Sequence, residues 1–144
     1  MKINIIASFI TVCLLPLSAF SANYGEMTVS RVSSIYDGDT FRAYIDSEHP
    51  IIGNNISIRV KGIDTPEIKS SCLKEKQLAR KAKEMTVYML RGANNIELKN
   101  IDRGKYFRIL ADVEVDGISL AKTLLDNNLA VKYDGGKKTH DWCN

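Results

Sequence analysis

The sequence predicts an α+β fold, mainly β, in which a five-stranded OB-fold barrel has helices packed against it. Three observations support that prediction. Five short segments are rich in β-branched and aromatic residues and are bounded by turn residues. One long helical pattern follows the third segment, and a shorter helical pattern follows the fifth. Strands and helices in this order are typical of an OB-type barrel capped by helices.

The first two predicted strands form a hairpin. They span residues 27–35 and 40–45, and the four residues between them make a turn in which we expect Gly38 to adopt positive φ. Residues 49–55 contain proline, glycine and two asparagines and are predicted to be a loop. The third strand follows at residues 56–63, where isoleucine and valine alternate with polar and basic residues, as in a strand buried on one face.

The remaining elements are two helices and two strands. The first helix is predicted over residues 71–91, and we expect Gly92 to end it. The side chains at helical spacing that should face the barrel are Leu78, Ala82, Met85, Thr86 and Met89. Strands are predicted at residues 96–101 and 107–115, and a second helix is predicted near residues 119–127.

The amino terminus has the pattern of a secretory signal peptide. Lys2 precedes an apolar run over residues 5–15, Pro16 breaks the run, and small residues then allow cleavage after Ser21 or Ala22. A transmembrane anchor is the alternative interpretation. Such an anchor needs about 20 apolar residues, which is more than this run contains, so the pattern favours a cleaved signal peptide.

Cleavage would leave residues 23–144, which we expect to form a single domain. The whole chain has 20 Lys and Arg against 17 Asp and Glu, a net charge of +3. Charge this close to balance argues against a protein that binds nucleic acid through bulk positive charge alone, so an acidic substrate must be bound by local clusters. We expect the protein without residues 1–22 to be a monomer, secreted or periplasmic, with no stable membrane association.

Two of the three cysteines, Cys72 and Cys143, remain after cleavage. An even number of cysteines in a chain exported to an oxidising compartment favours a disulfide between them. Such a bridge would hold the tail of residues 134–144, which is rich in glycine and lysine and has no periodic pattern. The alternative is two free thiols. Neither a CxxC pair nor a His/Cys cluster is present in the sequence, which disfavours a zinc site.

Four carboxylates occur in turns at the ends of predicted strands, in the motifs Asp37-Gly38-Asp39-Thr40 and Asp64-Thr65-Pro66-Glu67. Turns leave these side chains uncovered by the sheet, so carboxylates from the two motifs can converge. Carboxylate and carbonyl oxygens are the ligands that calcium and magnesium prefer. Each motif alone is better explained as ordinary turn chemistry, because aspartate and glycine are common in turns for conformational reasons.

Basic residues change that interpretation. Arg59 lies five residues before Asp64, and Lys105-Tyr106-Phe107-Arg108 lies farther along the chain. In order, spacing and residue type, the acidic and basic motifs resemble the staphylococcal nuclease (thermonuclease) family, over about Val29 to Ala130. The resemblance implies an OB barrel and calcium-dependent hydrolysis of DNA and RNA that leaves 3′-phosphates. One departure is Phe107, which stands where the best-known member of the family has glycine.

The resemblance also implies a role for each matching residue. Calcium would be bound by Asp39, Asp64 and the backbone carbonyl of Thr65. Glu67 would position or deprotonate the attacking water. The residues implied to hold the scissile phosphate are Arg59 and Arg108. The residues implied to contact the nucleotide are Lys105, Tyr106 and Tyr133.

The chemistry of phosphodiester hydrolysis favours the same residue types. The substrate is anionic, so its hydrolysis needs a cation and fixed donors at the phosphoryl oxygens, where a planar guanidinium gives two parallel hydrogen bonds. A carboxylate within hydrogen-bond reach of the water supplies the base. The alternative function is a noncatalytic OB-fold module that binds nucleic acid, but such a module has no need of Glu67 together with two acidic ligands and two arginines. The sequence leaves open whether DNA or RNA is preferred.

Overall fold

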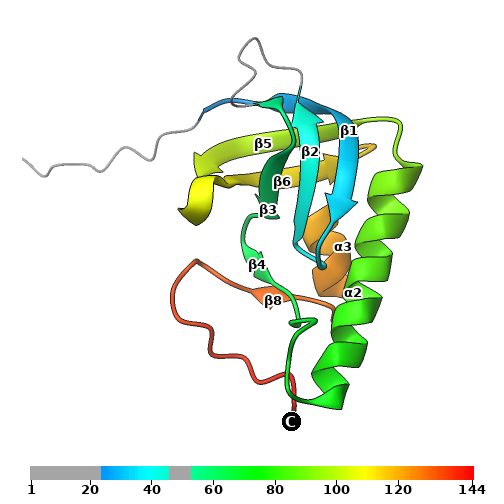
Figure 1. The fold of residues 1–144 in the computed structure, drawn as a ribbon, viewed down its shortest axis with the longest axis vertical. Coiled ribbons are helices and arrows are strands. Elements are labelled where there is room, and N and C mark those ends of the chain that lie inside the picture. The colour runs from blue at the N-terminus through cyan, green and yellow to red at the C-terminus, as the bar shows by residue number, and fades with distance from the viewer. Residues whose placement is uncertain (1–23, 46–52) are drawn as a thin grey trace, which may run out of the picture.

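A computed structural model describes residues 24–45 and 53–144, and its fold confirms the predicted barrel (Figure 1). Five strands form the barrel: β1 (Met27–Ile35), β2 (Thr40–Ile45), β3 (Ile56–Val60), β5 (Ile96–Arg103) and β6 (Ile109–Val115). Neighbouring strands run antiparallel in the order β3-β2-β1-β5-β6, and a parallel pairing of β3 with β6 closes the sheet. The predicted signal peptide and residues 49–52 of the predicted loop lie outside the described residues.

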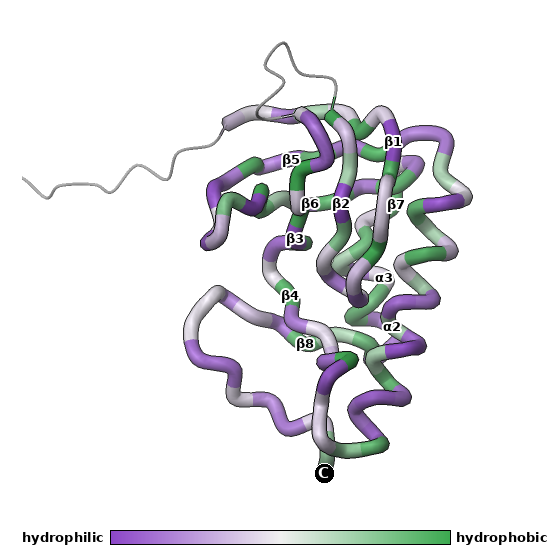
Figure 2. The backbone as a smooth tube through the Cα atoms, in the orientation of Figure 1, coloured by the Kyte–Doolittle hydropathy of each residue, from purple (hydrophilic) through white to green (hydrophobic). Residues whose placement is uncertain are grey.

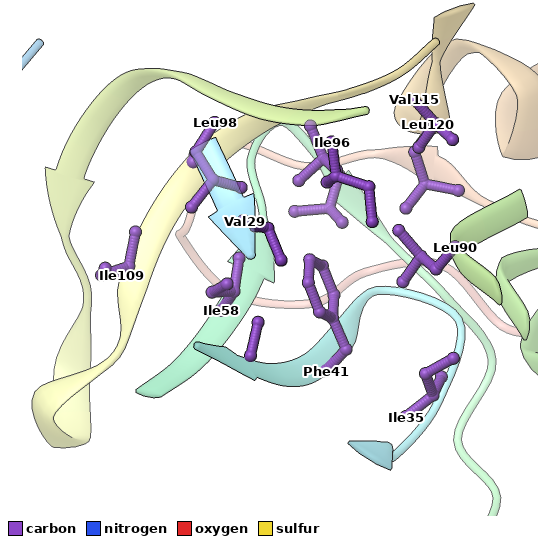
Figure 3. Packing of buried hydrophobic residues seen from close by; sticks show 14 of the residues in the cluster. Val29, Ile35, Phe41, Ile58, Leu90, Ile96, Leu98, Ile109, Val115 and Leu120 are labelled. Atoms are coloured by element: carbon purple, nitrogen blue, oxygen red, sulfur yellow. The ribbon is translucent and has the colours of Figure 1, made fainter. Parts of the chain in front are cut away.

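The interior of the barrel is filled by the inward-facing half of each strand. Burial alternates residue by residue along β3 and β6, which is the period of two that a strand with one buried face requires. Phe41, Ile58 and Leu98 are completely buried and point toward one another in Figure 3. Full burial of each such side chain contributes about 2 kcal/mol, so this interior is the main source of stability.

Two helices cover the barrel. The shorter one, α3 (Leu120–Asp126), follows the two-residue strand β7 (Ile118–Ser119) and buries Leu120 and Leu124 completely. The longer one, α2 (Leu73–Gly92), packs along the side of the barrel with four small or medium residues at helical spacing. These residues are Ala79, Ala82, Thr86 and Leu90.

The structure confirms the predicted inward face of α2 and adds two residues to it. Ala82 and Thr86 are buried, and Leu78, Met85 and Met89 are half-buried and pack against the core. The prediction missed Ala79 and Leu90, which are buried as well. The expectation that the helix ends at Gly92 is confirmed, because Gly92 is its last residue and Ala93 is the C-cap.

Hydrophobic periodicity does not predict the shortest segments of the structure. The strand β4 (Ile63–Asp64) separates from β3 and pairs antiparallel with β8 (Val131–Lys132). Farther along, β5 continues to Arg103, beyond its predicted end at residue 101, and β6 begins at Ile109 and not at residue 107, because a 3₁₀ turn, η1 (Lys105–Phe107), precedes it. Elements of two or three residues are too short to show a repeating pattern, so only tertiary pairing defines them.

The tail contains neither helix nor strand over residues 133–144 and is mostly hydrophilic in Figure 2. It loops below the barrel and returns to the start of α2, where Cys143 forms a disulfide with Cys72 across a Cα–Cα distance of 6.1 Å (Figure 1). The predicted disulfide is therefore present in the structure. Cys72 is also the N-cap of α2, since its Sγ accepts a hydrogen bond from the Glu75 backbone N–H.

None of the helices in the described part of the chain has both the length and the apolar composition that crossing a bilayer requires.

Candidate functional site

The site begins at the β1–β2 turn, which carries Asp37 and Asp39. The Asp37 carboxylate accepts a hydrogen bond from the backbone N–H of Asp39 at 3.1 Å, and this contact closes the turn. The prediction of positive φ at Gly38 is wrong, because Gly38 is outside the group of positive-φ glycines in the described chain. Glycine is required at position 38 for another reason, which is that the backbone of the turn lies very close to α2 there.

A Cβ atom at Gly38 would lie 2.8 Å from the Cβ of Ala82 and 2.9 Å from the Cγ2 of Thr65. The hydroxyl of Thr86 also donates a hydrogen bond to the Gly38 carbonyl at 2.7 Å. Helix α2 thus contacts the β1–β2 turn directly. Because the helix is rigid, this contact fixes the positions of the turn's carboxylates, Asp37 and Asp39.

Arg59, at the end of β3, joins two of the carboxylates. Its Nη1 lies 2.6 Å from Oδ1 of Asp39, and its Nη2 lies 3.0 Å from Oδ1 of Asp64. Asp39 also accepts hydrogen bonds from the Thr40 hydroxyl at 2.9 Å and from the Thr65 backbone N–H at 3.0 Å. The structure therefore brings together Asp39, Arg59, Asp64 and Thr65, as the sequence predicted.

Burial makes this cluster electrostatically unusual. Asp37, Asp39 and Asp64 are 7%, 1% and 4% exposed. Burial, reinforced by the negative charge of Asp39, raises the pKa of Asp37 to about 7. Burial also raises the pKa of Asp39, although the Arg59 charge and the hydrogen bonds from Thr40 and Thr65 oppose the rise.

Glu67 lies in the loop between β4 and α2 and not in the first turn of the helix, where Glu75 is the acidic residue. Its side chain is 51% exposed, and its backbone N–H donates to the Glu75 carboxylate at 2.9 Å. An acid placed only to favour the helix dipole would belong in the first turn. Glu67 instead presents its carboxylate beside Asp64 at the open side of the cluster.

One residue of the site escaped the sequence prediction. Lys138, in the tail, places Nζ 2.8 Å from Oδ1 of Asp64 and 2.5 Å from Oε1 of Glu67. Partial burial lowers the pKa of Lys138, but the hydrogen bonds and negative charges of Asp64 and Glu67 together outweigh burial. The pKa of Lys138 is therefore raised. The usable signal was the predicted disulfide, because tying Cys143 to Cys72 brings the tail back to the loop that carries Glu67.

The donor set suits a hard divalent cation. Four clustered carboxylates face only two cationic side chains, Arg59 and Lys138, so the site keeps an excess of negative charge. Calcium prefers oxygen ligands, which Asp39, Asp64 and the backbone carbonyl of Thr65 would supply. Within the described residues, metal-binding atoms of His, Cys, Asp and Glu gather in a group of three only at Cys72, Glu75 and Cys143. There the two sulfurs are bonded to each other, so that group is no metal site.

The β5–β6 turn carries the second predicted group of substrate contacts. Tyr106 is 89% exposed, Lys105 is exposed as well, and Tyr106 and Phe107 have φ values of 60° and 59°. The left-handed backbone at Phe107 is the conformation that favours glycine, the residue of the best-known family member at this position. Arg108 donates to the Lys105 carbonyl at 3.3 Å, and its described contacts do not include the carboxylates.

Tyr133 lies close to the site, at the end of β8. Its backbone N–H donates to the Gly62 carbonyl at 3.0 Å, and its hydroxyl donates to the Gly136 carbonyl at 2.6 Å. The guanidinium carbon of Arg59 lies 6.0 Å from the centre of its ring. Of the predicted nucleotide contacts, Tyr133 is thus beside the cluster, whereas Lys105 and Tyr106 belong to the separate β5–β6 turn.

Comparison with known proteins identifies one family. The family model described as staphylococcal nuclease homologue matches residues 57–142, which is more than half of the chain. The match includes Arg59, Asp64, Glu67 and Arg108 and continues through the tail. A search of curated proteins found no match.

Proposed function

Since this chain belongs to the staphylococcal nuclease homologue family, we propose that it is a calcium-dependent endonuclease that hydrolyses phosphodiester bonds in DNA and RNA and leaves 3′-phosphates. The observation that carries the proposal is the cluster of buried carboxylates joined by one arginine. Asp39 and Asp64 are nearly inaccessible, yet both are held at 3.0 Å or less by Arg59. Burying charges in this way costs stability, which a purely structural turn would not require.

Calcium held by Asp39, Asp64 and the Thr65 carbonyl would neutralise charge on the phosphate and polarise it. Glu67 is the base in this proposal, because its carboxylate is exposed and lies at the edge of the cluster. It takes a proton from a water whose oxygen bonds to phosphorus. The bond from phosphorus to the 5′ oxygen then breaks and that oxygen takes up a proton from solvent, which leaves a 3′-phosphate on one product and a 5′-hydroxyl on the other.

Two arginines would stabilise the charge that develops on the phosphoryl oxygens. Arg59 is already at the carboxylates, so its guanidinium needs only to exchange one carboxylate for the phosphate. Arg108 is on the exposed β5–β6 turn, and we expect the substrate to draw this turn toward the cluster. The neighbouring Lys105 and Tyr106 would then contact the nucleotide, as would Tyr133.

The alternative is a noncatalytic module that binds nucleic acid by stacking. The exposed rings of Tyr36 and Tyr106 favour it, because each could stack on a base. Stacking alone gives no reason to bury Asp39 and Asp64, however. The alternative function therefore accounts for the exposed tyrosines and not for the buried carboxylates.

We further propose that residues 1–22 are a cleaved signal peptide and that residues 23–144 act as a secreted or periplasmic monomer. The Cys72–Cys143 disulfide supports export, since structural disulfides persist mainly in oxidising compartments. No stable association with a membrane is expected after cleavage.

The test is incubation of the purified, oxidised protein with DNA and with RNA, in calcium and in excess chelator. We expect calcium to support cleavage of both polymers and the chelator to abolish it. Removal of the terminal phosphate by a phosphatase would identify the 3′-phosphate ends. Full activity in chelator would contradict the calcium assignment, and binding without cleavage would favour the noncatalytic module.

A further inference from the structure

Lys138 has contacts that are unusual for a lysine in an irregular tail. Its ammonium group bridges the buried carboxylate of Asp64 at 2.8 Å and the exposed carboxylate of Glu67 at 2.5 Å. One of these residues is the proposed metal ligand and the other is the proposed base. The tail thus directly contacts residues that are proposed to bind the metal and to act as the base.

Both ends of the tail segment around Lys138 are fixed. On one side, the Tyr133 N–H bonds to the Gly62 carbonyl, next to the β4–β8 pairing. On the other side, Cys143 is bonded to Cys72 at the start of α2. Lys138 lies five residues from each of these anchors, so the two anchors limit how far the segment can move from the site.

Stabilisation of the fold does not explain this position. The Asp64 oxygen that Lys138 contacts is already bonded to Arg59 at 3.0 Å, so the buried carboxylate has a partner without the tail. The Lys138 side chain is 43% exposed, and ion pairs of exposed side chains contribute little to stability. The contact therefore points to a role in the reaction.

The expected place of the substrate explains it better. A base must lie within hydrogen-bond reach of its water, and that water lies about 3 Å from the atom it attacks. An ammonium group bonded to Glu67 is consequently near the phosphoryl oxygens of the bound substrate. A divalent cation on Asp64 would repel the ammonium group, and the long flexible stem of a lysine allows it to turn toward the phosphate.

We infer that Lys138 is a further substrate-binding residue of this site, which the disulfide-tethered tail delivers to a phosphate at or next to the scissile bond. The inference rests on the proposed nuclease function, which it deepens. In the resting protein Lys138 bonds to Asp64 and Glu67, and in the complex it donates to a phosphoryl oxygen. Its role is binding, since the water, the base and the metal ligands are supplied by other residues.

The neighbouring Lys137 provides a matched control. It belongs to the same tail, carries the same charge and lines a groove with Lys61, Lys132 and Tyr133, whereas the ion pairs with Asp64 and Glu67 are made by Lys138. If only the net charge of the tail mattered, replacing Lys137 and replacing Lys138 would have equal effects. If the contact geometry matters, the effects differ.

The kinetic test compares Lys138→Met, Lys138→Arg and Lys137→Met in calcium, with melting temperatures measured on the same samples. For Lys138→Met we expect KM to rise about tenfold, the scale of one hydrogen bond to a charged group, while kcat changes little. Lys138→Arg should restore most of the loss, and Lys137→Met should change KM less than about threefold. Equal KM values for Lys138→Met and wild type would overturn the inference, as would equal losses in the two methionine variants.

A second readout uses calcium alone, titrated calorimetrically into wild type and Lys138→Met. The variant should bind calcium at least as tightly as wild type, because an ammonium group no longer competes for Asp64. Weaker calcium binding would mean that Lys138 supports the geometry of the metal site, and would overturn the binding role.

Failure of the nuclease proposal would be visible separately, as absence of cleavage by wild type in calcium. In that case the salt dependence of binding to labelled single-stranded DNA decides the role of Lys138. Loss of one phosphate contact lowers the slope of log affinity against log salt by about 0.7 for a single strand. A slope reduced by that amount in Lys138→Met supports the inference, and an unchanged slope contradicts it.

Discussion

The carboxylate end of the barrel, formed by Asp37, Asp39, Arg59 and Asp64, contrasts with the β5–β6 turn that carries Arg108. Both regions hold an arginine that is proposed to bind the phosphate. In the first, the arginine is 14% exposed and is bonded to two buried carboxylates. In the second, the arginine donates to a neighbouring carbonyl beside an almost fully exposed tyrosine.

The difference follows from the charges involved. Buried carboxylates need partners in the free protein, because an unpaired buried charge is strongly destabilising. The carboxylate end is therefore organised before any ligand arrives, by the barrel on one side and α2 on the other. A guanidinium group in water needs no such support, so the β5–β6 turn can be ordered by the substrate itself. In the proposed nuclease, one half of the site is built by folding and the other would be completed by substrate binding.

The largest effect is expected from the disulfide, which fixes the tail beside the carboxylate end and leaves the β5–β6 turn untouched. Cys72 and Cys143 are separated by 71 residues, for which the chain-entropy model gives about 4 kcal/mol of stability. Replacing both cysteines with serine should lower the free energy of unfolding by that amount, measured by urea denaturation. The value of kcat should largely survive, and an unchanged unfolding free energy would show that the bridge does not constrain the unfolded chain.

The two arginines give the next largest effect and the sharpest contrast. Arg59→Ala and Arg108→Ala should each lower kcat/KM by at least about a hundredfold, the usual scale for losing a charge-stabilising donor. Only Arg59→Ala should also destabilise the fold, by about 3 kcal/mol, because it removes the cation bonded to Asp39 and leaves Asp64 with Lys138 alone. Arg80→Ala, on the exposed face of α2, is the matched control. Near-normal turnover by Arg108→Ala would remove the β5–β6 turn from the site.

A smaller effect is expected where α2 holds the β1–β2 turn. Gly38→Ala would place a methyl group 2.8 Å from the Cβ of Ala82, and overpacking of this kind costs about 2 kcal/mol. Gly92→Ala is the control, since a Cβ there meets no described atom within 4 Å. Thermal melts of both variants measure the difference. Equal stability would mean that the turn relaxes away from α2, and the carboxylate end would then be less rigid than its packing indicates.

Most of the fold was accessible from local sequence patterns, because the barrel strands are long enough to show their period. The hairpin of residues 27–35 and 40–45 matches β1 and β2, since alternation and turn residues agree there. The β4–β8 pairing was inaccessible, because two-residue strands have no period. Periodicity identified the inward face of α2 but missed Ala79 and Leu90, which are also buried.

In the site, too, the residues in local sequence motifs were predicted, and those placed by tertiary contacts were not. The resemblance to the nuclease family singled out Asp39, Arg59 and Asp64, and the structure brings these three residues together. Lys138 was missed because its position depends on a disulfide that closes across most of the chain. Gly38 was recognised as necessary for the wrong reason, since its packing against Thr65 and Ala82 is a tertiary contact that no local pattern records.

The most direct test of the central claim, that the carboxylate end is a hydrolytic centre, compares Glu67→Gln with Glu75→Gln. The two acids are neighbours, because the Glu75 carboxylate accepts a hydrogen bond from the Glu67 backbone N–H. Single-turnover cleavage of a labelled oligonucleotide in saturating calcium should slow by at least about a hundredfold in Glu67→Gln, the scale for losing a general base. Glu75→Gln should stay within about threefold of wild type, since it keeps the oxygen that accepts this bond. Equal cleavage rates for Glu67→Gln and wild type would contradict the account.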